Sequence, residues 1–183
     1  MFSSDLRVMA RQLEADQVMK KAFKQRLVEK SYVALVRGAL SSETRVVDAP
    51  IGKDADGPIR IKMAVRADGK PAATELRVLH RFGSTDWGDA GRGYSWVAAV
   101  PLTGRTHQIR LHLAHLGHPL VGDKIYSDEG LAFLRRWDGE MDGGDLARLE
   151  LPRHALHALD LRFDHPISRE PLGLRSQVPS EVA

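Results

Sequence analysis

The sequence YSWVAAVPLTGRTHQIRLHLAHLGHP, residues 94–119, shows how the chain is built. Its first part, Tyr94 to Leu102, is rich in apolar and aromatic residues and predicts a strand that closes at Thr103-Gly104. From Thr106 to His115 the apolar residues recur with helical spacing, and Gly117 is a plausible helix stop. A strand therefore delivers a Gly-Arg turn onto a helix, and polar side chains are concentrated at that junction.

Upstream of this unit, one amphipathic helix and several strands are expected. Residues Ala15 to Glu29 have apolar side chains at three- and four-residue steps and a basic opposite face, which predicts a helix. Lys30 to Arg37 alternates like a strand and ends at a glycine. Two further regions, Arg45 to Val65 and Ala73 to Phe82, predict successive antiparallel strands separated by turn sequences at 54–57 and 68–71.

Downstream, the pattern is less regular. Gly130 to Arg136 predicts a short helix, and Asp138 to Leu149, rich in Gly, Asp and Glu, is interpreted as a surface loop. A strand is expected from His154 to Phe163, followed by a flexible tail over residues 168–183. Helices and strands occur in uneven order without βαβ alternation, so the predicted fold class is α+β: a mixed, mostly antiparallel sheet with flanking helices. Residues 1–183 are expected to form a single domain.

Composition excludes several classes of protein. The chain has no cysteine, which excludes disulfides and cysteine-ligated metals. No stretch approaches the roughly 18 to 20 continuous apolar residues of a membrane helix, and a cytoplasmic location without membrane contact is expected. The net charge is +3 and the isoelectric point about 9.3, with local clusters of Lys and Arg. These clusters permit an anionic partner, although a solvated basic helix face is the more frequent explanation.

The histidines after the Gly-Arg turn invite a metal interpretation. His112 and His115 are three residues apart and His118 follows, but no carboxylate or cysteine completes a ligand set and no His-Glu-x-x-His pattern exists. In the alternative interpretation, Thr103 or Thr106 caps the helix and the histidines make satisfied hydrogen bonds. The same helix start, with its free N–H groups, also suits a phosphate. Arg110 could instead pair with a buried carboxylate and hold it ionised.

Taken together, the motifs resemble those of RluA-like RNA pseudouridine synthases. The longest match is Gly104-Arg-Thr-His-Gln-Ile-Arg110, which continues through Leu111-His112, Gly117-His-Pro119 and Val121-Gly-Asp-Lys-Ile-Tyr126. Three further segments agree in order and approximate spacing: 29–38, Gly69-Lys-Pro-Ala72 with Thr74, and 156–166. The resemblance covers essentially residues 6–166, and a chance match over four ordered motifs is not credible.

The resemblance implies a reaction and roles for several residues. Family members isomerise uridine to pseudouridine in structured RNA without cofactor or metal, and the target base must leave its stack. An aspartate acts as nucleophile, Tyr32 matches the tyrosine that stacks on the base, and Arg110 matches the arginine that pairs with the nucleophile. The expected pocket and RNA contacts are Arg105, Thr106 and His107 in the turn, with Lys24, Arg26 and Lys30 as candidates for phosphate contact. Leu156 and Phe163 are expected only to pack.

The chain departs from the family pattern at its start. Ser3 to Ala10 lines up with the segment that follows the family's Arg-Leu-Asp motif, so the nucleophile is expected just before Met1. Asp5 stands at the family's glycine position. About five extended residues separate it from the nucleophile's place, which displaces its carboxylate by on the order of 16 Å. We therefore expect no rescue by Asp5, and marginal stability from an unpaired sheet edge.

Three hypotheses follow from the sequence. The favoured one is an RNA pseudouridine synthase acting on rRNA or tRNA whose present chain lacks the nucleophile and is inactive. The second is a non-catalytic RNA-binding or RNA-chaperone module. The third, a metal-dependent hydrolase using His107, His112 and His115, is remote. The motifs do not specify which RNA or which uridine is used, and they say nothing of the oligomeric state.

Overall fold

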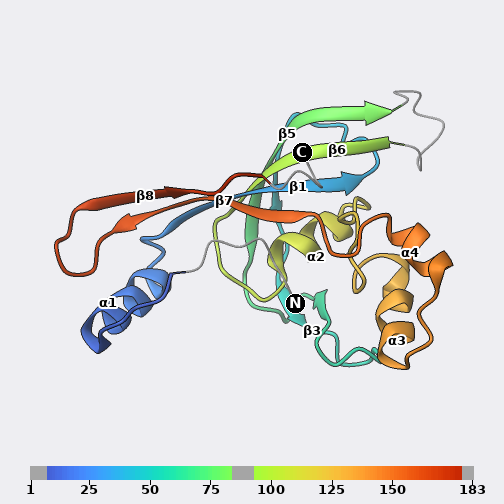
Figure 1. The fold of residues 1–183 in the computed structure, drawn as a ribbon, viewed down its shortest axis with the longest axis horizontal. Helices are drawn as coiled ribbons and strands as arrows, with labels where there is room; N and C mark the ends of the chain where they lie inside the picture. The colour runs from blue at the N-terminus through green and yellow to red at the C-terminus, as the bar shows by residue number, and fades with distance from the viewer. Residues whose placement is uncertain (1–7, 84–92, 179–183) are drawn as a thin grey trace.

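The computed structural model describes residues 8–83 and 93–178. Its main feature is a six-stranded sheet in the order β2-β5-β6-β1-β7-β8, and each neighbouring pair is antiparallel (Figure 1). The strands are β1 (Glu29–Arg37), β2 (Thr44–Asp48), β5 (Ala73–Gly83), β6 (Gly93–Pro101), β7 (Leu156–Asp164) and β8 (Pro171–Arg175). A separate ribbon pairs β3 (Ile51–Lys53) with β4 (Met63–Val65). The α+β prediction with a mostly antiparallel sheet is confirmed.

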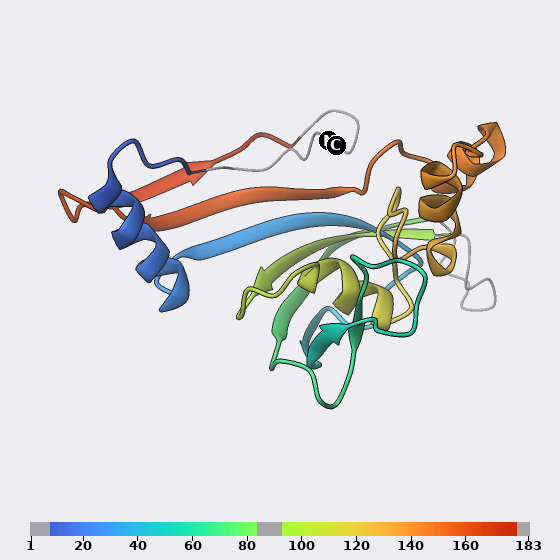
Figure 2. The same cartoon turned by 90° about the horizontal axis from the view of Figure 1, so that it is seen from below.

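One face of the sheet carries the main core. Alternation along the strands points small and branched apolar residues to this face, where helix α2 (Gln108–His115) covers β5 and β6 (Figure 2). Ile109 and Leu113 supply the helix side of the contact, and Leu113 is completely buried. On another side of α2, Leu111 packs with Ile51 and Ala72 against the β3-β4 ribbon. The strand β6 and the helix α2 are therefore fixed together, as residues 94–119 predicted.

A second, smaller core lies at one end of the sheet. β1, β7 and β8 run past the end of β6 and form an extension, here called the arm, with α1 (Leu13–Lys24) at its end (Figures 1 and 2). Met19 of α1 packs with Val28, Leu161 and Phe163, so the packing role expected for Phe163 is seen. The other helices, α3 (Leu131–Trp137) and α4 (Gly143–Leu149), lie at the opposite end of the sheet, preceded by the short 3-10 helix η1 (Asp128–Gly130).

The first helix is shorter than predicted. The amphipathic pattern predicted a helix to Glu29, but α1 ends at Lys24 because Arg26 adopts the left-handed conformation, with φ of 62°. The N–H of Leu27 donates to the carbonyl of Ala22 at 3.0 Å, and the N–H of Arg26 donates to Phe23 at 3.3 Å, which is a Schellman ending. Val28 and Glu29 are thereby released to enter the arm.

Two predictions in the second half of the chain are wrong. The segment 138–149 is not wholly a loop, because Asp142 and Asp145 form a reciprocal capping box that starts α4. Within the predicted tail, Pro171–Arg175 forms β8 and pairs with β7, while residues 179–183 lie outside the described residues. In the described parts of the chain, no helix is both long and apolar enough to span a bilayer.

Candidate functional site

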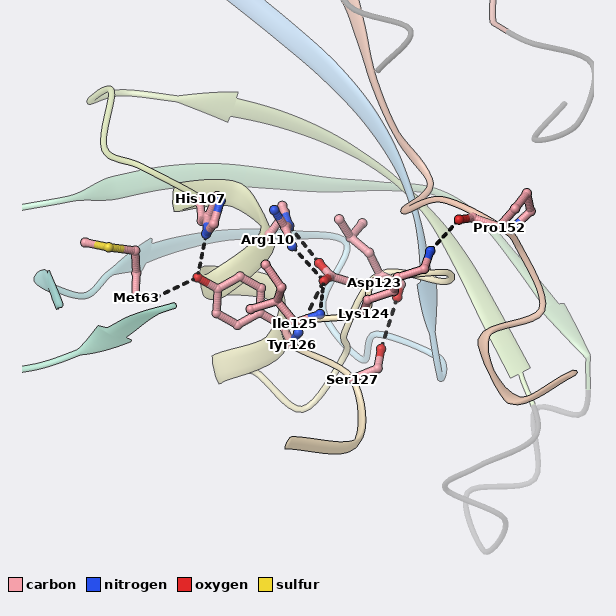
Figure 3. Close-up of polar contacts among 10 residues, drawn as sticks. Met63, His107, Arg110, Asp123, Lys124, Ile125, Tyr126, Ser127 and Pro152 are labelled. Carbon is pink, nitrogen blue, oxygen red and sulfur yellow. Dashed lines mark hydrogen bonds and ion pairs between the residues drawn. The ribbon is translucent and has the colours of Figure 1, made fainter. Parts of the chain in front are cut away.

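Arg110 is fixed by a buried carboxylate. It lies on α2, and its Nε and Nη2 atoms each donate to a carboxylate oxygen of Asp123 at 2.8 Å (Figure 3). Asp123 is completely buried, and its Oδ1 atom also accepts the N–H groups of Ile125 (3.0 Å) and Tyr126 (3.2 Å). Burial alone would raise the pKa of Asp123, but the hydrogen bonds and charge of Arg110 and the two N–H donors lower it. The structure therefore shows Arg110 paired with a buried carboxylate, which was one of the alternatives considered from the sequence.

Tyr126 connects Arg110 to the start of α2. Its ring lies under the guanidinium of Arg110, 5.1 Å from the ring centroid, and its hydroxyl is 3.0 Å from Nδ1 of His107 (Figure 3). The N–H of Met63 donates to the same hydroxyl at 3.1 Å. Burial, helped by the charge of Arg110, lowers the pKa of His107 to about 4, and burial raises the pKa of Tyr126 to about 12. At neutral pH the tyrosine hydroxyl and an uncharged imidazole therefore share one hydrogen bond, whose direction is set by the imidazole tautomer.

Gln108 holds the Gly-Arg turn against the sheet. Its Oε1 atom accepts from Thr103 Oγ1 (2.6 Å) and from the N–H of Arg105 (3.0 Å). Its Nε2 atom donates to the carbonyl of Ala73 (2.8 Å) and to Thr74 Oγ1 (3.0 Å). The predicted capping by Thr103 or Thr106 is wrong, since the N-cap of α2 is His107, which is left-handed with φ of 56°. The turn is held by a buried side chain rather than by a cap.

Two of the histidines considered as metal ligands, His112 and His118, make hydrogen bonds to other groups. His112 is completely buried: Nε2 donates to the carbonyl of Ala49 at 3.0 Å, and Nδ1 accepts from Thr74 at 2.9 Å. Burial lowers the pKa of His112, in keeping with a neutral ring. Nδ1 of His118 donates to the carbonyl of Arg37 at 2.9 Å. Across residues 8–83 and 93–178, no three His, Asp or Glu side chains are grouped so that they could hold a metal ion.

Tyr32 lies on the face of the sheet that α2 covers. Its backbone pairs with Ala99 of β6 and Ala158 of β7, and a bulge between Ser31 and Tyr32 shifts the register with β7. The half-buried ring packs against the main core, to which Ile109 of α2 also belongs. It also lines a cavity of about 130 Å³, here called the Tyr32 cavity, together with Val8, Phe23, Lys30, Ala158, Asp160 and Leu161.

The remaining predicted site residues separate into two groups. Arg105 belongs to the turn, where its Nε atom donates to the carbonyl of Pro71 at 3.1 Å, and Thr106 beside it is exposed. Arg26 and Lys30 line a larger cavity of about 440 Å³ between the arm and the turn. Lys24 is exposed in the last turn of α1 and lines neither cavity. The expected nucleophile position and Asp5 lie outside the described residues.

Sequence reasoning assigned no role to several residues that organise the site. Asp123 and Tyr126 entered the sequence analysis only as part of a motif, although a carboxylate in the tight turn after Gly122 is a plausible partner for a helix arginine. Gln108 was read as one of several polar helix residues. Arg162 on β7 lines the larger cavity and had no signal in the sequence beyond strand alternation.

Comparisons with known proteins agree with the motifs. A family model described as RNA pseudouridylate synthase matches residues 3–115. Ribosomal large subunit pseudouridine synthase D of Nitrosomonas europaea is 39% identical over 99% of this chain and 46% of that protein. Ribosomal large subunit pseudouridine synthase C of Vibrio cholerae is 32% identical over 98% of this chain and 50% of that protein. The solved structure of human RNA pseudouridylate synthase domain containing 1 superposes with a TM-score of 0.70 at 30% identity, covering 92% of this chain and 62% of that one.

The chain belongs to the RNA pseudouridylate synthase family, and the resemblance to its RluA-like members is confirmed. It spans about half the length of the curated relatives it matches.

Proposed function

We propose that this chain forms the greater part of the catalytic domain of an RNA pseudouridine synthase that isomerises uridine in large-subunit rRNA, with tRNA as the alternative substrate. The observation that carries the proposal is that α2, which bears Arg110, covers the sheet face on which Tyr32 lies, while Asp123 orients Arg110 through two hydrogen bonds. The ring of Tyr32 beside its cavity suits stacking on a uracil that has left its helix. The names of the relatives support rRNA, and with it a cytoplasmic place of action.

In this proposal Asp123 is not the nucleophile. Its side chain is completely buried, and its two oxygens accept four hydrogen bonds from Arg110, Ile125 and Tyr126. A carboxylate so enclosed cannot reach a base or a ribose carbon without breaking its pair with Arg110. Its role is to orient the guanidinium, whose remaining nitrogen, Nη1, makes no other hydrogen bond within the described residues. That nitrogen is available to a second carboxylate.

The nucleophile is proposed to come from the Arg-Leu-Asp motif expected just before Met1. Val8, the first residue that the structure describes, lines the Tyr32 cavity, so the chain enters the fold beside the residue proposed to stack on the base. Residues preceding Val8 could therefore bring a carboxylate to this region. No metal or cofactor is needed for the proposed isomerisation, so activity should persist in EDTA.

The test is a pseudouridine assay on rRNA and tRNA with three proteins. The first is the present chain, the second carries an N-terminal Arg-Leu-Asp, and the third carries Arg-Leu-Asn as its matched control. A fourth protein, in which the upstream half of the Nitrosomonas relative is fused to this chain, tests activity if three added residues do not restore the fold. We expect product only with the aspartate.

Other outcomes distinguish the remaining hypotheses. Product from the present chain that disappears in Asp5→Ala would overturn the assignment of the nucleophile. If none of the proteins forms pseudouridine but all still bind RNA, the non-catalytic RNA-binding module is favoured.

A further inference from the structure

The larger cavity, here called the arm cavity, lies between the arm and the Gly-Arg turn. Its walls come from the end of α1, the start of β1, the end of β6 with Thr103 and Gly104, and from Asp160 and Arg162 of β7. Nζ of Lys30 lies 3.8 Å from the position that a Cβ would take on Gly104, so strand β1 closely approaches the turn. The end of α1 and the start of β1 are neighbours in sequence, whereas the parts of β6, the turn and β7 come from distant segments that the sheet brings to them.

Three cations line this cavity without a carboxylate partner. Arg26, Lys30 and Arg162 make no ion pair within the described residues, and Lys30 instead lies over the ring of Phe23 at 5.6 Å from its centroid. Two carboxylates also line the cavity. Asp160 accepts from Ser31 Oγ at 3.0 Å and faces Arg175 at 3.8 Å, while Glu29 is exposed opposite Arg162. The unpaired cations therefore leave a net positive charge facing the cavity.

Arg26 occupies a backbone position that favours glycine. It is the left-handed residue that ends α1, with φ of 62°, where a side chain is a disadvantage for stability. A strained residue in a well-formed ending points to a use for its side chain. The side chain of Arg26 lines the arm cavity, so an anion bound there would lie within its reach.

Lys30 connects the arm cavity to the Tyr32 cavity. It lines both, and it stands two residues before Tyr32 on the same strand, so the two side chains share a face about 7 Å apart along the strand. Burial lowers the pKa of Lys30, a cost that a bound anion would offset. One ligand can therefore place a base against Tyr32 and an adjacent phosphate beside Lys30.

From these observations we infer that the arm cavity binds an RNA phosphodiester next to the target nucleotide, through Arg26, Lys30 and Arg162. The inference rests on the proposed function, because it takes Tyr32 as the residue that stacks on the base. It adds Arg162, which no motif indicated, and it assigns the arm to holding the RNA backbone.

The test is a titration of the full chain with a fluorescent RNA hairpin bearing an unpaired uridine, at several salt concentrations. Arg26→Gly, Lys30→Gln and Arg162→Gln should each weaken binding on the order of tenfold and lower the salt slope by about one. Lys21→Gln removes the same charge from α1 away from the cavity and should bind like the parent. Arg26→Gly should keep or raise the Tm, because glycine suits its backbone, so its loss of binding cannot be attributed to unfolding.

Two results would overturn the inference: parental affinity and slope in all three cavity variants, or an equal loss in Lys21→Gln. Its failure is separable from that of the proposed function. If the aspartate-bearing protein makes pseudouridine and Arg26→Gly in that protein retains kcat/KM, the proposed synthase function is supported and the proposed phosphate site is refuted. If no protein makes pseudouridine but the cavity variants selectively lose RNA affinity, the phosphate site is supported and the proposed synthase function is not.

Discussion

The Arg110–Asp123 pair positions a cation rather than adding stability. Taking two charges from water costs free energy that their attraction only partly returns, so such a pair is weak evidence for a stable fold. Its value lies in geometry, because two parallel hydrogen bonds at 2.8 Å leave the guanidinium one orientation. Tyr126 reinforces that orientation from below the guanidinium plane.

Asp123→Asn should destabilise the protein by about 3–5 kcal/mol, because it leaves the Arg110 cation buried and turns an amide donor toward another donor. Chemical denaturation monitored by fluorescence measures the change. Asp68→Asn is the matched control, since it removes the same charge from an exposed pair with Arg66 and should shift the denaturation midpoint little. Equal midpoints for the two variants would contradict this account of the buried pair.

His107 should make stability depend on pH between about 4 and 6.5. Its pKa is about 4 in the fold, against 6.5 for a free histidine, because burial and the Arg110 charge disfavour the cation. In that window the unfolded chain binds a proton that the folded chain does not, so stability falls as pH falls. Asn tolerates the left-handed backbone of His107 and removes the titration.

The measurement is the free energy of unfolding of the parent and of His107→Asn from pH 7 to pH 3.5. The parent should lose stability relative to the variant between 6.5 and 4, and the difference should be constant below 4. The pKa of Asp123 is lowered, so the stability that this carboxylate contributes is lost at still lower pH and does not alter the difference between the parent and the variant from pH 6.5 to 4. A constant difference across the whole range would contradict a depressed pKa at His107.

At the scale of elements, the end of α2 and the turn after it each contain a glycine, and the sequence does not show which of the two tolerates a side chain less. Gly117 and Gly122 both adopt positive φ, of 83° and 74°. Open space surrounds Gly117, whereas a Cβ on Gly122 would overlap the carbonyl of Arg153. The turn that supplies Asp123 is therefore packed directly against the segment before β7.

Gly117→Ala should cost about 1–2 kcal/mol, the strain of a side chain in the left-handed region. Gly122→Ala should cost clearly more, because backbone must move as well, and it should also disturb Asp123. Thermal unfolding of the two variants provides the comparison. Equal Tm values would show that the backbone at Arg153 moves away from the added Cβ at little cost in free energy.

At the scale of the molecule, the two cores should open independently. The main core joins α2 to the sheet, while Met19 belongs to the small core at the end of the arm. Met19→Ala should speed amide exchange in α1 and leave β6 protected, because few contacts tie α1 to the rest. Leu113→Ala should cost about 2–5 kcal/mol and speed exchange in β6 and β1 as well.

Hydrogen exchange followed by mass spectrometry resolves the two patterns. Parallel loss of protection in α1 and β6 after Met19→Ala would mean that the molecule unfolds as one unit. Independent opening would fit an arm that adjusts to RNA while the site around Arg110 stays fixed.

Local sequence predicted the elements whose signals are local. Strand alternation and helical spacing placed β1, β5, β6 and α2 within a few residues, because these patterns follow from which face is buried. Two errors have local causes that residue composition does not reveal. The Asp142–Asp145 capping box starts a helix inside a polar stretch, and the left-handed backbone of Arg26 ends α1 early. The strand β8 was missed because its exposed residues carry no core pattern and it exists by pairing with β7.

By itself the sequence determined the family and the mostly antiparallel α+β fold, and it proposed Tyr32 and Arg110 as site residues, since ordered motifs and periodicity are properties of the chain. Only the tertiary structure decided that Arg110 pairs with Asp123, that Gln108 binds both Thr103 and Arg105 in the turn, and that Arg162 lines the same cavity as Arg26 and Lys30. The physical reason is that hydrogen bonds and charges act over a few ångströms in space, and the pairing of the strands sets which residues come that close.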